Sequence, residues 1–459
     1  MSDAPVTLSS PSAPAPPARP AGQRLAWLDA LRGFAALCVV FDHISAYALP
    51  HLRADIYQYL DPGTYGVFVF FLVSGYIVPA SLERKGSIRG FWVSRVFRLY
   101  PLYVFALTVA VFLWWIGIGT IGGTNFQGET SLLTHALMLS NVLGNHNAVN
   151  VIWTLSYEMA FYLLLTAMFV TGTHKRSSRW ALLFAVAAAG LGGLLPMTLI
   201  SRSFLGTRLV AEIADLLIVA GVALAVTRFR LPRKAGAILA GGTALALVCF
   251  NGNWVNPFEA LTILALMFTG TMLYRAERGD YPWRRAAPAA VVVFVLTTAA
   301  GLWYGRTWAP AYHWQWATSV LGAGLTFAIG MACRRRKVPS ALAWLGVISF
   351  SVYLTHPLLI QFYKSIPLTH GPHPFPEQVL LAGTFVAVLL GFSWLSYRYV
   401  EKPMQRHGRT FGRWLDTWFG PDIVRAVAAA GPEPAIVHEA IVPVADSGPQ
   451  DPVTEPVRR

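Results

Sequence analysis

Long apolar stretches alternate with short polar segments along most of the chain. Each stretch has roughly the 20 residues that an α-helix needs to cross the hydrocarbon core of a bilayer. The pattern predicts an all-α fold, a polytopic transmembrane helix bundle of about 10–12 spans. The expected spans lie near residues 25–49, 64–83, 99–118, 151–171, 180–200, 208–226, 236–252, 256–274, 287–305, 314–333, 344–364 and 377–399.

The two ends of the chain have a different composition from the rest. Residues 1–24 are rich in Pro, Ala and Ser and lack the apolar core of a signal peptide, which predicts a disordered cytoplasmic tail. Residues 25–400 are expected to form one transmembrane domain. Residues 401–459 are expected to begin with an amphipathic helix on the membrane surface and to end in a second disordered cytoplasmic tail. No second folded domain is expected there.

Composition and charge narrow the class of protein. Of 459 residues, 55% are hydrophobic and 13% are charged, which makes the lipid bilayer the expected environment. The formal net charge of +14 could suggest nucleic acid, but the basic residues lie between apolar stretches, so no nucleic-acid partner is expected. Cys38, Cys249 and Cys333 lie far apart without metal-ligand spacing, and no metal site is predicted.

The Lys and Arg residues fall in alternate connections between the predicted spans. Cytoplasmic loops hold an excess of these residues, so the alternation predicts that both termini are cytoplasmic. The segment 119–150 contains neither Lys nor Arg and is expected on the outer side, with His135 and His146 solvated or interfacial. The basic segments are residues 84–98, 175–179, 228–234, 275–285, 334–337 and 402–413.

The first span carries four ionisable residues, Asp29, Arg32, Asp42 and His43, which are costly in lipid unless they face protein or water. Arg32 and His43 are about 20 degrees apart around the helix and ~16 Å apart along it, and Asp29 shares their face. One interpretation is structural: Asp29 pairs with Arg32 and His43 only packs. Intramembrane ionisable groups are functional candidates by default, which favours a site. Gly33 on this face would let another helix approach closely.

Other spans place ionisable residues at a similar depth. Glu158 in the stretch "WTLSYEMAFYLLL" lies ~10 Å from the outer end of its span, and His43 lies ~9 Å from its own. Asp215 and His356 belong to the same layer by this estimate. Because a carboxylate fixes the tautomer of an imidazole and raises its basicity, we expect His43 to act in acid/base catalysis with Glu158 as its partner.

On the cytoplasmic side, "FWVSRVFRLYPLY" places Arg95 and Arg98 three residues apart on one helical face. Two guanidinium groups suit phosphate binding, although any cytoplasmic loop of this protein would be basic.

Taken together, these motifs resemble the membrane-bound acyltransferase-3 family of bacterial multipass proteins. The resemblance rests on "LDALRGFAALCVVFDHIS" with Arg32 and His43, "GVFVFFLVSGYIV", "FWVSRVFRLYPLY" with Arg95 and Arg98, "IWTLSYEMAFYLL" with Glu158, "ISFSVYLTHPLL" with His356 and "SYRYVEKPMQ" with Glu401. Residues 172–340 resemble the family only in being apolar.

The resemblance implies an O-acyltransferase in the bacterial inner membrane. The donor would be cytoplasmic acyl-CoA, usually acetyl-CoA, used as a substrate rather than as a bound cofactor. Arg95 and Arg98 would hold CoA phosphates and Arg32 would line the donor path, while His43 would activate the acceptor hydroxyl or carry the acyl group transiently. The acceptor would be a cell-surface or exported polysaccharide or its lipid-linked precursor, with polysaccharide-assembly proteins as partners. Some relatives carry an additional extracytoplasmic esterase-like domain, and this chain is expected to lack one.

Two other functions remain open from the residues alone. A proton-coupled secondary transporter would use His43, Glu158, Asp215 and His356 as a proton relay. An acyltransferase for a small molecule such as an antibiotic would use the same donor site.

Overall fold

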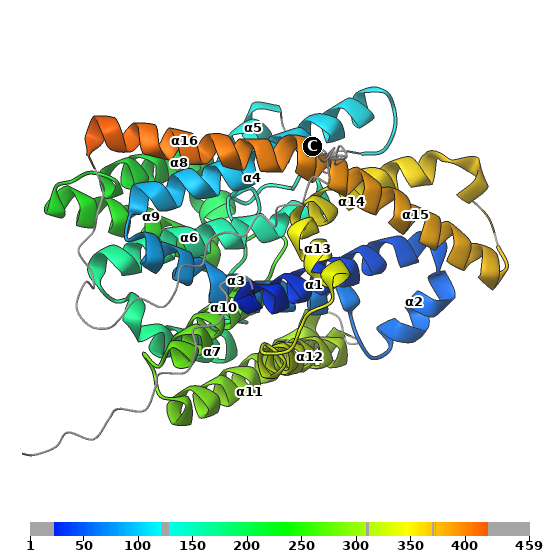
Figure 1. Cartoon of the computed structure of the whole chain (residues 1–459), viewed down its shortest axis with the longest axis horizontal. Coiled ribbons are helices and arrows are strands. Elements are labelled where there is room, and N and C mark those ends of the chain that lie inside the picture. The colour runs from blue at the N-terminus through cyan, green and yellow to red at the C-terminus, as the bar shows by residue number, and fades with distance from the viewer. Residues whose placement is uncertain (1–22, 121–127, 309–311, 370, 372, 421–459) are drawn as a thin grey trace, which may run out of the picture.

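The computed structural model describes residues 23–120, 128–308, 312–369, 371 and 373–420, and all of its regular structure is helical within these ranges (Figure 1). The prediction of an all-α bundle is confirmed. In the first half the helices are α1 Gln23–Ala48, α2 Pro50–Tyr57, α3 Pro62–Lys85, α4 Ile88–Trp115, α5 Gly128–Ala136, η2 Asn150–Ile152, α6 Trp153–Thr171, η3 His174–Arg176, α7 Ser177–Leu191, η4 Ser201–Leu205 and α8 Thr207–Ala225. In the second half they are α9 Arg230–Phe250, α10 Pro257–Arg278, α11 Trp283–Trp308, α12 Tyr312–Ala332, α13 Ser340–Val347, α14 Ser349–Ser365, η5 Pro367–Thr369, α15 Phe375–Ser396, η6 Tyr397–Glu401 and α16 Lys402–Phe419.

Each expected span coincides with a helix or a helix pair, but fewer helices are long and apolar enough to cross a membrane. Within the described ranges eight pass by length and composition, or nine if α13 and α14, bent by 66° at their junction, form one broken span. The predicted 10–12 spans included α7, which is only 15 residues long, and α8, which carries Arg208, Glu212 and Asp215. The spans α3, α6 and α10 are the most buried, and α4 and α11 lie at the periphery.

Ion pairs gather the ends of several helices at one end of the bundle, which we call the basic end. The Arg275 guanidinium at the end of α10 pairs with the Glu83 carboxylate at the end of α3. Arg334, just after α12, binds Glu277 of α10 with a nitrogen–oxygen distance of 2.8 Å. These two ion pairs therefore bring the basic connections after α3, α10 and α12 together on one side of the bundle.

Small residues bring two pairs of helices into close contact. A Cβ atom at Gly75 of α3 would lie 1.9 Å from the carbonyl oxygen of Met267 in α10. A Cβ atom at Gly346 of α13 would lie 2.0 Å from the carbonyl oxygen of Asp29, and one at Gly33 would lie 2.8 Å from the nitrogen of Gly346. The close approach expected at Gly33 is thus confirmed, and its partner is α13.

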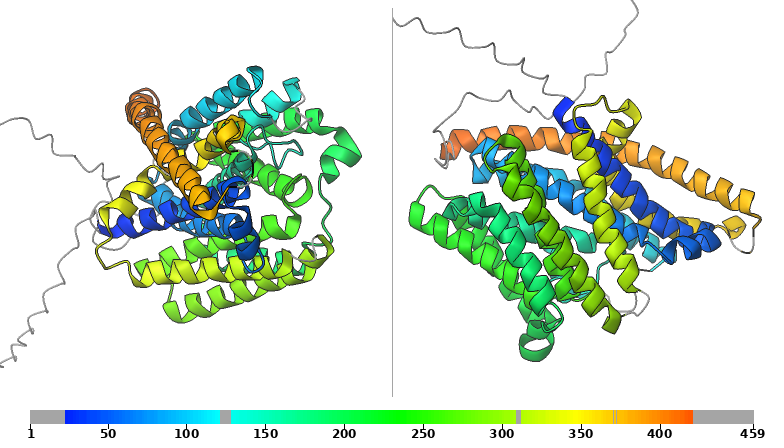
Figure 2. Two further views of the ribbon diagram at one scale, coloured as in Figure 1. Left: turned by 90° about the vertical axis from the view of Figure 1, so that its right-hand side faces the viewer. Right: turned by 90° about the horizontal axis from the view of Figure 1, so that it is seen from below.

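The last helices form one continuous rod along one side of the molecule (Figures 1 and 2). The α16 segment runs antiparallel to the first half of α4: Phe97 of α4 stacks near Phe411 with ring centroids 5.6 Å apart, and Arg89 pairs with Asp416. The helix expected after residue 400 is present as Lys402–Phe419 and packs on the bundle, while the tails at 1–22 and 421–459 lie outside the described residues.

Candidate active site

Two histidines from different helices meet near the end of the bundle opposite the basic end. The ring centroids of His43 in α1 and His356 in α14 are 5.1 Å apart, with the edge of one ring facing the other. Nδ1 of His43 lies 2.9 Å from the Val39 carbonyl oxygen, and Nδ1 of His356 lies 3.2 Å from that of Val352. A carbonyl only accepts, so in the neutral rings each Nδ1 donates and each Nε2 is left as an acceptor.

The two rings differ in access. His356 is fully buried, and its Nε2 has no hydrogen-bond partner in the described chain. His43 is half-buried. The Nε2 atom of His43 is therefore the more accessible base, and His356 forms the wall behind it.

Asp42 stands next to His43 but is held by α2. Its Oδ1 accepts from the Arg53 guanidinium at 2.8 Å and from the Tyr57 hydroxyl. The distance from its Oδ2 to His43 Nδ1 is 3.7 Å, which is too long for a hydrogen bond. Asp42 therefore joins α1 to α2 and contributes negative charge near the imidazole.

Tyr353, one turn before His356, was not singled out from the sequence. Its hydroxyl donates to the Val151 carbonyl at 2.9 Å and lies 2.9 Å from the Thr154 hydroxyl. Its ring stacks on Phe70 and lies 5.9 Å from the His356 ring. The signal available in the sequence was its position on the same face of the "SVYLTHP" helix as His356.

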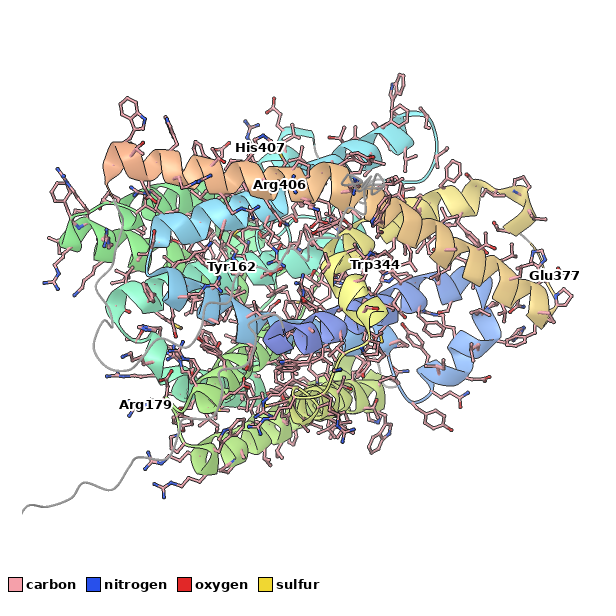
Figure 3. All side chains as sticks on the ribbon, in the orientation of Figure 1. Tyr162, Arg179, Trp344, Glu377, Arg406 and His407 are labelled. Carbon is pink, nitrogen blue, oxygen red and sulfur yellow. The ribbon has the colours of Figure 1, made fainter. Side chains whose placement is uncertain are left out.

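Glu158 lies deeper in the bundle than the histidine pair. It is buried, and its Oε1 accepts a hydrogen bond from the Tyr162 hydroxyl one turn further along α6, inside the bundle (Figure 3). The negative charge of the Glu158 carboxylate also attracts the positive charge of the Arg32 guanidinium. The expected pairing of Glu158 with His43 is not the arrangement observed, because the ring beside His43 is that of His356. Spacing in the sequence allowed an estimate of how deep Glu158 and His43 lie along their helices. It did not show the direction in which each side chain points around its helix.

Arg95 supports this carboxylate from α4. Its guanidinium carbon lies 5.4 Å from the ring centroids of both Phe91 and Tyr162, and the residue is only 6% exposed. A guanidinium between two aromatic faces is stabilised by cation–π attraction. Arg95 thus holds Tyr162, which in turn binds Glu158.

Arg32 occupies the centre of a layer of charged groups, which we call the arginine layer. Its guanidinium lies 5.9 Å from the Phe70 ring centroid. Buried Glu401, from η6, accepts from the Ser351 hydroxyl of α14. Two arginines, Arg32 and Arg98, face three carboxylates here, which offsets the cost of burying each charge. The charges acting on Arg32 are those of Asp29, Arg98, Glu158 and Glu401.

A narrow gap of about 10 Å³ lies beside Arg32 between α1, α3, α6 and α14, and neither His43 nor His356 lines it. One wall is the face of α1 that runs from Arg32 to Val39, the residue whose carbonyl orients His43. The opposite walls include Thr154 of α6 and Tyr353 of α14. The face of α1 that begins at Arg32 therefore lines this gap as far as Val39, one turn before His43.

Asp215 lies elsewhere. The polar group on which its charge acts is Tyr100 of α4, whose hydroxyl donates to the Ala136 carbonyl at the end of α5. Its Oδ1 is buried without a partner in the described chain. The charge of Asp215 thus acts on a tyrosine of α4, and no interaction joins it to the histidine pair within the described chain.

The fold and these layers define the class of protein: a multi-pass membrane protein with a histidine pair and, further back along α1, a buried layer of arginines and carboxylates. The chain belongs to the family described as "Acyltransferase domain", whose model matches residues 25–208 and 213–398. The predicted family is confirmed, and the match extends through the middle region, where the sequence offered no motif.

Relatives support this assignment at low identity. The putative peptidoglycan O-acetyltransferase YrhL of Bacillus subtilis (strain 168) is 23% identical over 84% of this chain and 56% of its own length. The putative membrane-bound transacylase BcsY of Komagataeibacter xylinus is 26% identical over 82% of this chain and 81% of its own. The acyltransferase MdmB of Streptomyces mycarofaciens is 32% identical over 30% of this chain and 38% of its own. The chain thus spans little more than half the length of YrhL. No solved structure matches.

Proposed function

We propose that the protein is an integral membrane O-acyltransferase that moves an acyl group, acetyl in the first instance, from acyl-CoA to a hydroxyl of a carbohydrate. The observation that carries the proposal is the placement of two polar groups along α1: Arg32 lies among buried charges, and His43, three turns further on, lies against His356. Two relatives are named for O-acetyl transfer to peptidoglycan or for transacylation at a membrane, which supports a surface polysaccharide or its lipid-linked precursor as acceptor.

The proposed orientation puts the basic end and both termini in the cytoplasm of a bacterium, with the protein in its inner membrane. The donor then enters from the arginine layer. Arg98 and Arg32 are the groups proposed to hold CoA phosphates. The position of Arg95 between Phe91 and Tyr162 suits it to fix the Tyr162–Glu158 pair, and it would reach a phosphate only by leaving those rings.

The proposed reaction uses His43 as a general base. Its Nε2 takes the proton of the acceptor hydroxyl while the hydroxyl oxygen attacks the thioester carbonyl carbon. The carbon–sulfur bond then breaks, and the CoA sulfur leaves with the proton returned by the imidazolium. Donation from Nδ1 to the Val39 carbonyl keeps the base at Nε2, and His356 positions the ring. In a variant of this scheme, Nε2 of His43 attacks the thioester first and CoA leaves. The imidazole then carries the acyl group until the acceptor arrives.

The experiment that tests the proposal measures release of CoA thiol from acetyl-CoA by protein in lipid nanodiscs, with a crude polysaccharide fraction as acceptor. His43→Ala should abolish transfer, and His356→Gln should lower kcat more than it changes KM for acetyl-CoA. His51→Ala, at an exposed histidine of α2 on the same side, is the matched control and should behave as wild type. Normal transfer by folded His43→Ala protein would disprove the mechanism, and thiol release before acceptor is added would identify the acyl-histidine variant.

A further inference from the structure

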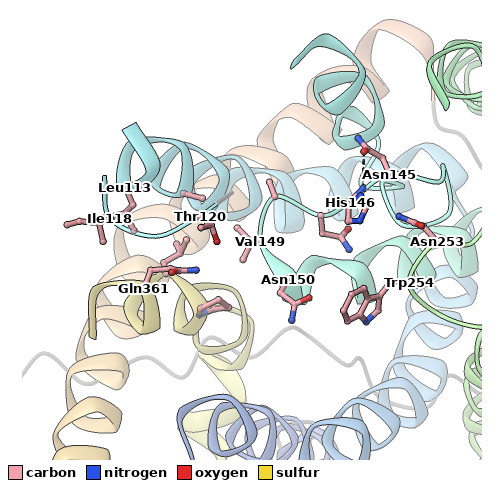
Figure 4. Close-up of a pocket in the computed structure, with 15 residues that line it drawn as sticks. Leu113, Ile118, Thr120, Asn145, His146, Val149, Asn150, Asn253, Trp254 and Gln361 are labelled. Carbon is pink, nitrogen blue, oxygen red and sulfur yellow. Dashed lines mark hydrogen bonds between the residues drawn. The ribbon is translucent and has the colours of Figure 1, made fainter. Parts of the chain in front are cut away.

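A larger cavity borders the turn of α14 that follows His356. It has a volume of about 330 Å³ and lies between the end of α4, the segment before η2, the segment before α10, and α14 (Figure 4). Pro357 and Leu358 form part of its wall, and Pro357 follows His356 directly. The cavity and His356, the ring against which the candidate base His43 packs, therefore share one turn of α14.

The lining of this cavity is polar but uncharged. None of its 15 residues is Lys, Arg, Asp or Glu, so a phosphate or carboxylate would find no opposite charge. Trp254 stands at its edge with 59% of its surface exposed, so its indole face is accessible to a ligand in the cavity. The side chains of Asn150, Asn253 and Gln361 have no hydrogen-bond partner within the described chain.

These groups match the chemistry of a neutral sugar. A carboxamide offers both a donor and an acceptor, and so does each hydroxyl of a sugar ring. The face of an indole covers the apolar face of such a ring. A cavity with convergent amides and one exposed indole therefore suits a hydroxyl-rich, uncharged ligand.

The wall of the cavity is already fixed. Asn145 is buried, and its amide nitrogen donates to the hydroxyls of Ser131 and Thr134 at 3.2 and 2.9 Å. Its Oδ1 accepts the backbone N–H of His146 at 2.9 Å, which is the bond drawn in Figure 4. On the other side, Gly119 has φ +82, and a Cβ there would lie 2.6 Å from Gln361 Oε1, so the absence of a side chain makes room for that amide. The site needs little ordering when a ligand enters.

We propose that this cavity is the acceptor subsite, which holds an uncharged sugar unit of the glycan against Trp254 and the amides of Asn150, Asn253 and Gln361. The reactive hydroxyl extends past Pro357 towards His43. This inference rests on the proposed acyltransferase function, because it assigns the cavity to the second substrate of that reaction.

The test compares Trp254→Ala with Trp314→Ala in nanodiscs, using acetyl-CoA and the neutral oligosaccharide chitotetraose. Trp314 is a matched control because it is 60% exposed and does not line the cavity. Trp254→Ala should raise KM for chitotetraose about tenfold without changing KM for acetyl-CoA, and Asn150→Ala should raise it less. Trp314→Ala should match wild type. Equal KM values for the two tryptophan variants would overturn the proposal.

Binding measured without donor separates this inference from the proposed function. Calorimetric titration of wild-type protein with chitotetraose and with cellotetraose should show binding that Trp254→Ala weakens. Binding of this kind without any transfer of acetyl groups would leave the subsite standing and remove the acyltransferase. Absence of binding by both oligosaccharides at millimolar concentration would overturn the subsite, whatever the outcome for CoA release.

Discussion

The imidazoles of His43 and His356 are oriented in the same way although they come from helices far apart in the sequence. Each Nδ1 is bound to the carbonyl four residues earlier in its own helix, so the tautomer is fixed locally. The side chain that lies opposite each Nε2 belongs to a neighbouring helix and therefore depends on how the helices pack. The sequence could therefore identify both residues as candidates but could not pair them.

His135 is buried, whereas the sequence predicted an accessible side chain. The residue was expected to be solvated or interfacial because it lies in the segment without Lys or Arg. In the structure it is buried in α5, where its Nε2 accepts the backbone N–H of Ala148 at 3.0 Å and its Nδ1 lies 2.7 Å from the Ser131 carbonyl. Exposed His146, in contrast, agrees with the expectation.

At acidic pH, protonation of His135 should destabilise the wall of the large cavity. His135 lies outside the candidate membrane spans. Burial lowers the pKa of His135 below its usual value. In the unfolded chain the ring binds a proton below about pH 6.5, whereas the folded ring resists it. Its contribution to the free energy of unfolding is therefore complete above that pH and falls as the pH drops below it.

This effect can be measured by thermal unfolding of nanodisc-embedded protein at about pH 7.5 and about pH 5.5. The melting temperature of wild type should fall by several degrees more than that of His135→Gln, whose amide keeps an acceptor for Ala148 without titrating. His146→Gln is the control and should follow wild type. An equal acid shift in wild type and His135→Gln would contradict the assignment.

At the scale of elements, the crossing of α1 and α13 sets the position of the histidine pair. The Gly33–Gly346 contact brings the two backbones together, and α13 leads into α14, which carries Tyr353 and His356. The 66° bend between α13 and α14 turns the second helix towards α6. No local pattern encodes this bend, so the sequence predicted one continuous span over 344–364.

Gly346→Ala should therefore damage both stability and transfer. The added Cβ would lie 2.0 Å from the Asp29 carbonyl oxygen, and the helices can accept it only by moving apart. We expect a loss of about 1–3 kcal/mol in unfolding free energy and a fall in kcat. Gly391→Ala in α15 is the control, because nothing lies within 4 Å of a Cβ there. Thermal unfolding and CoA release would measure both effects, and wild-type behaviour of Gly346→Ala would refute the argument.

At the scale of the whole molecule, ion pairs and basic connections define one end, and the uncharged cavity defines the other. The pairs Arg275–Glu83 and Arg334–Glu277 tie three helices together at the basic end. A donor rich in phosphate and a neutral sugar would each find matching chemistry at a different end. In the proposed reaction, the length of the bundle would separate the two substrates until they met beside His43.

The orientation can be tested by labelling single cysteines with a membrane-impermeant maleimide in spheroplasts. Cys38, Cys249 and Cys333 are first replaced by Ala. Tyr59→Cys, 71% exposed beyond α2, should label in intact spheroplasts, and Trp418→Cys, 72% exposed on α16, should label only after permeabilisation. The reverse pattern would place the basic end outside and reject the proposed entry side for the donor.

The sequence by itself determined the helical class, the approximate positions of the long apolar helices and the alternation of basic connections. These properties are local, because the length of an apolar stretch and the charge of its flanks require no knowledge of its neighbours. The motifs also indicated the family, which the family match confirms.

Only the tertiary structure decided which side chains meet. It placed His43 against His356, Glu158 against Tyr162, and Asp215 beside Tyr100. It also formed the large cavity from four segments distant in the chain. The rotation of each helix about its axis and the angle at which two helices cross depend on packing between residues far apart in sequence, and no periodicity within one segment records them.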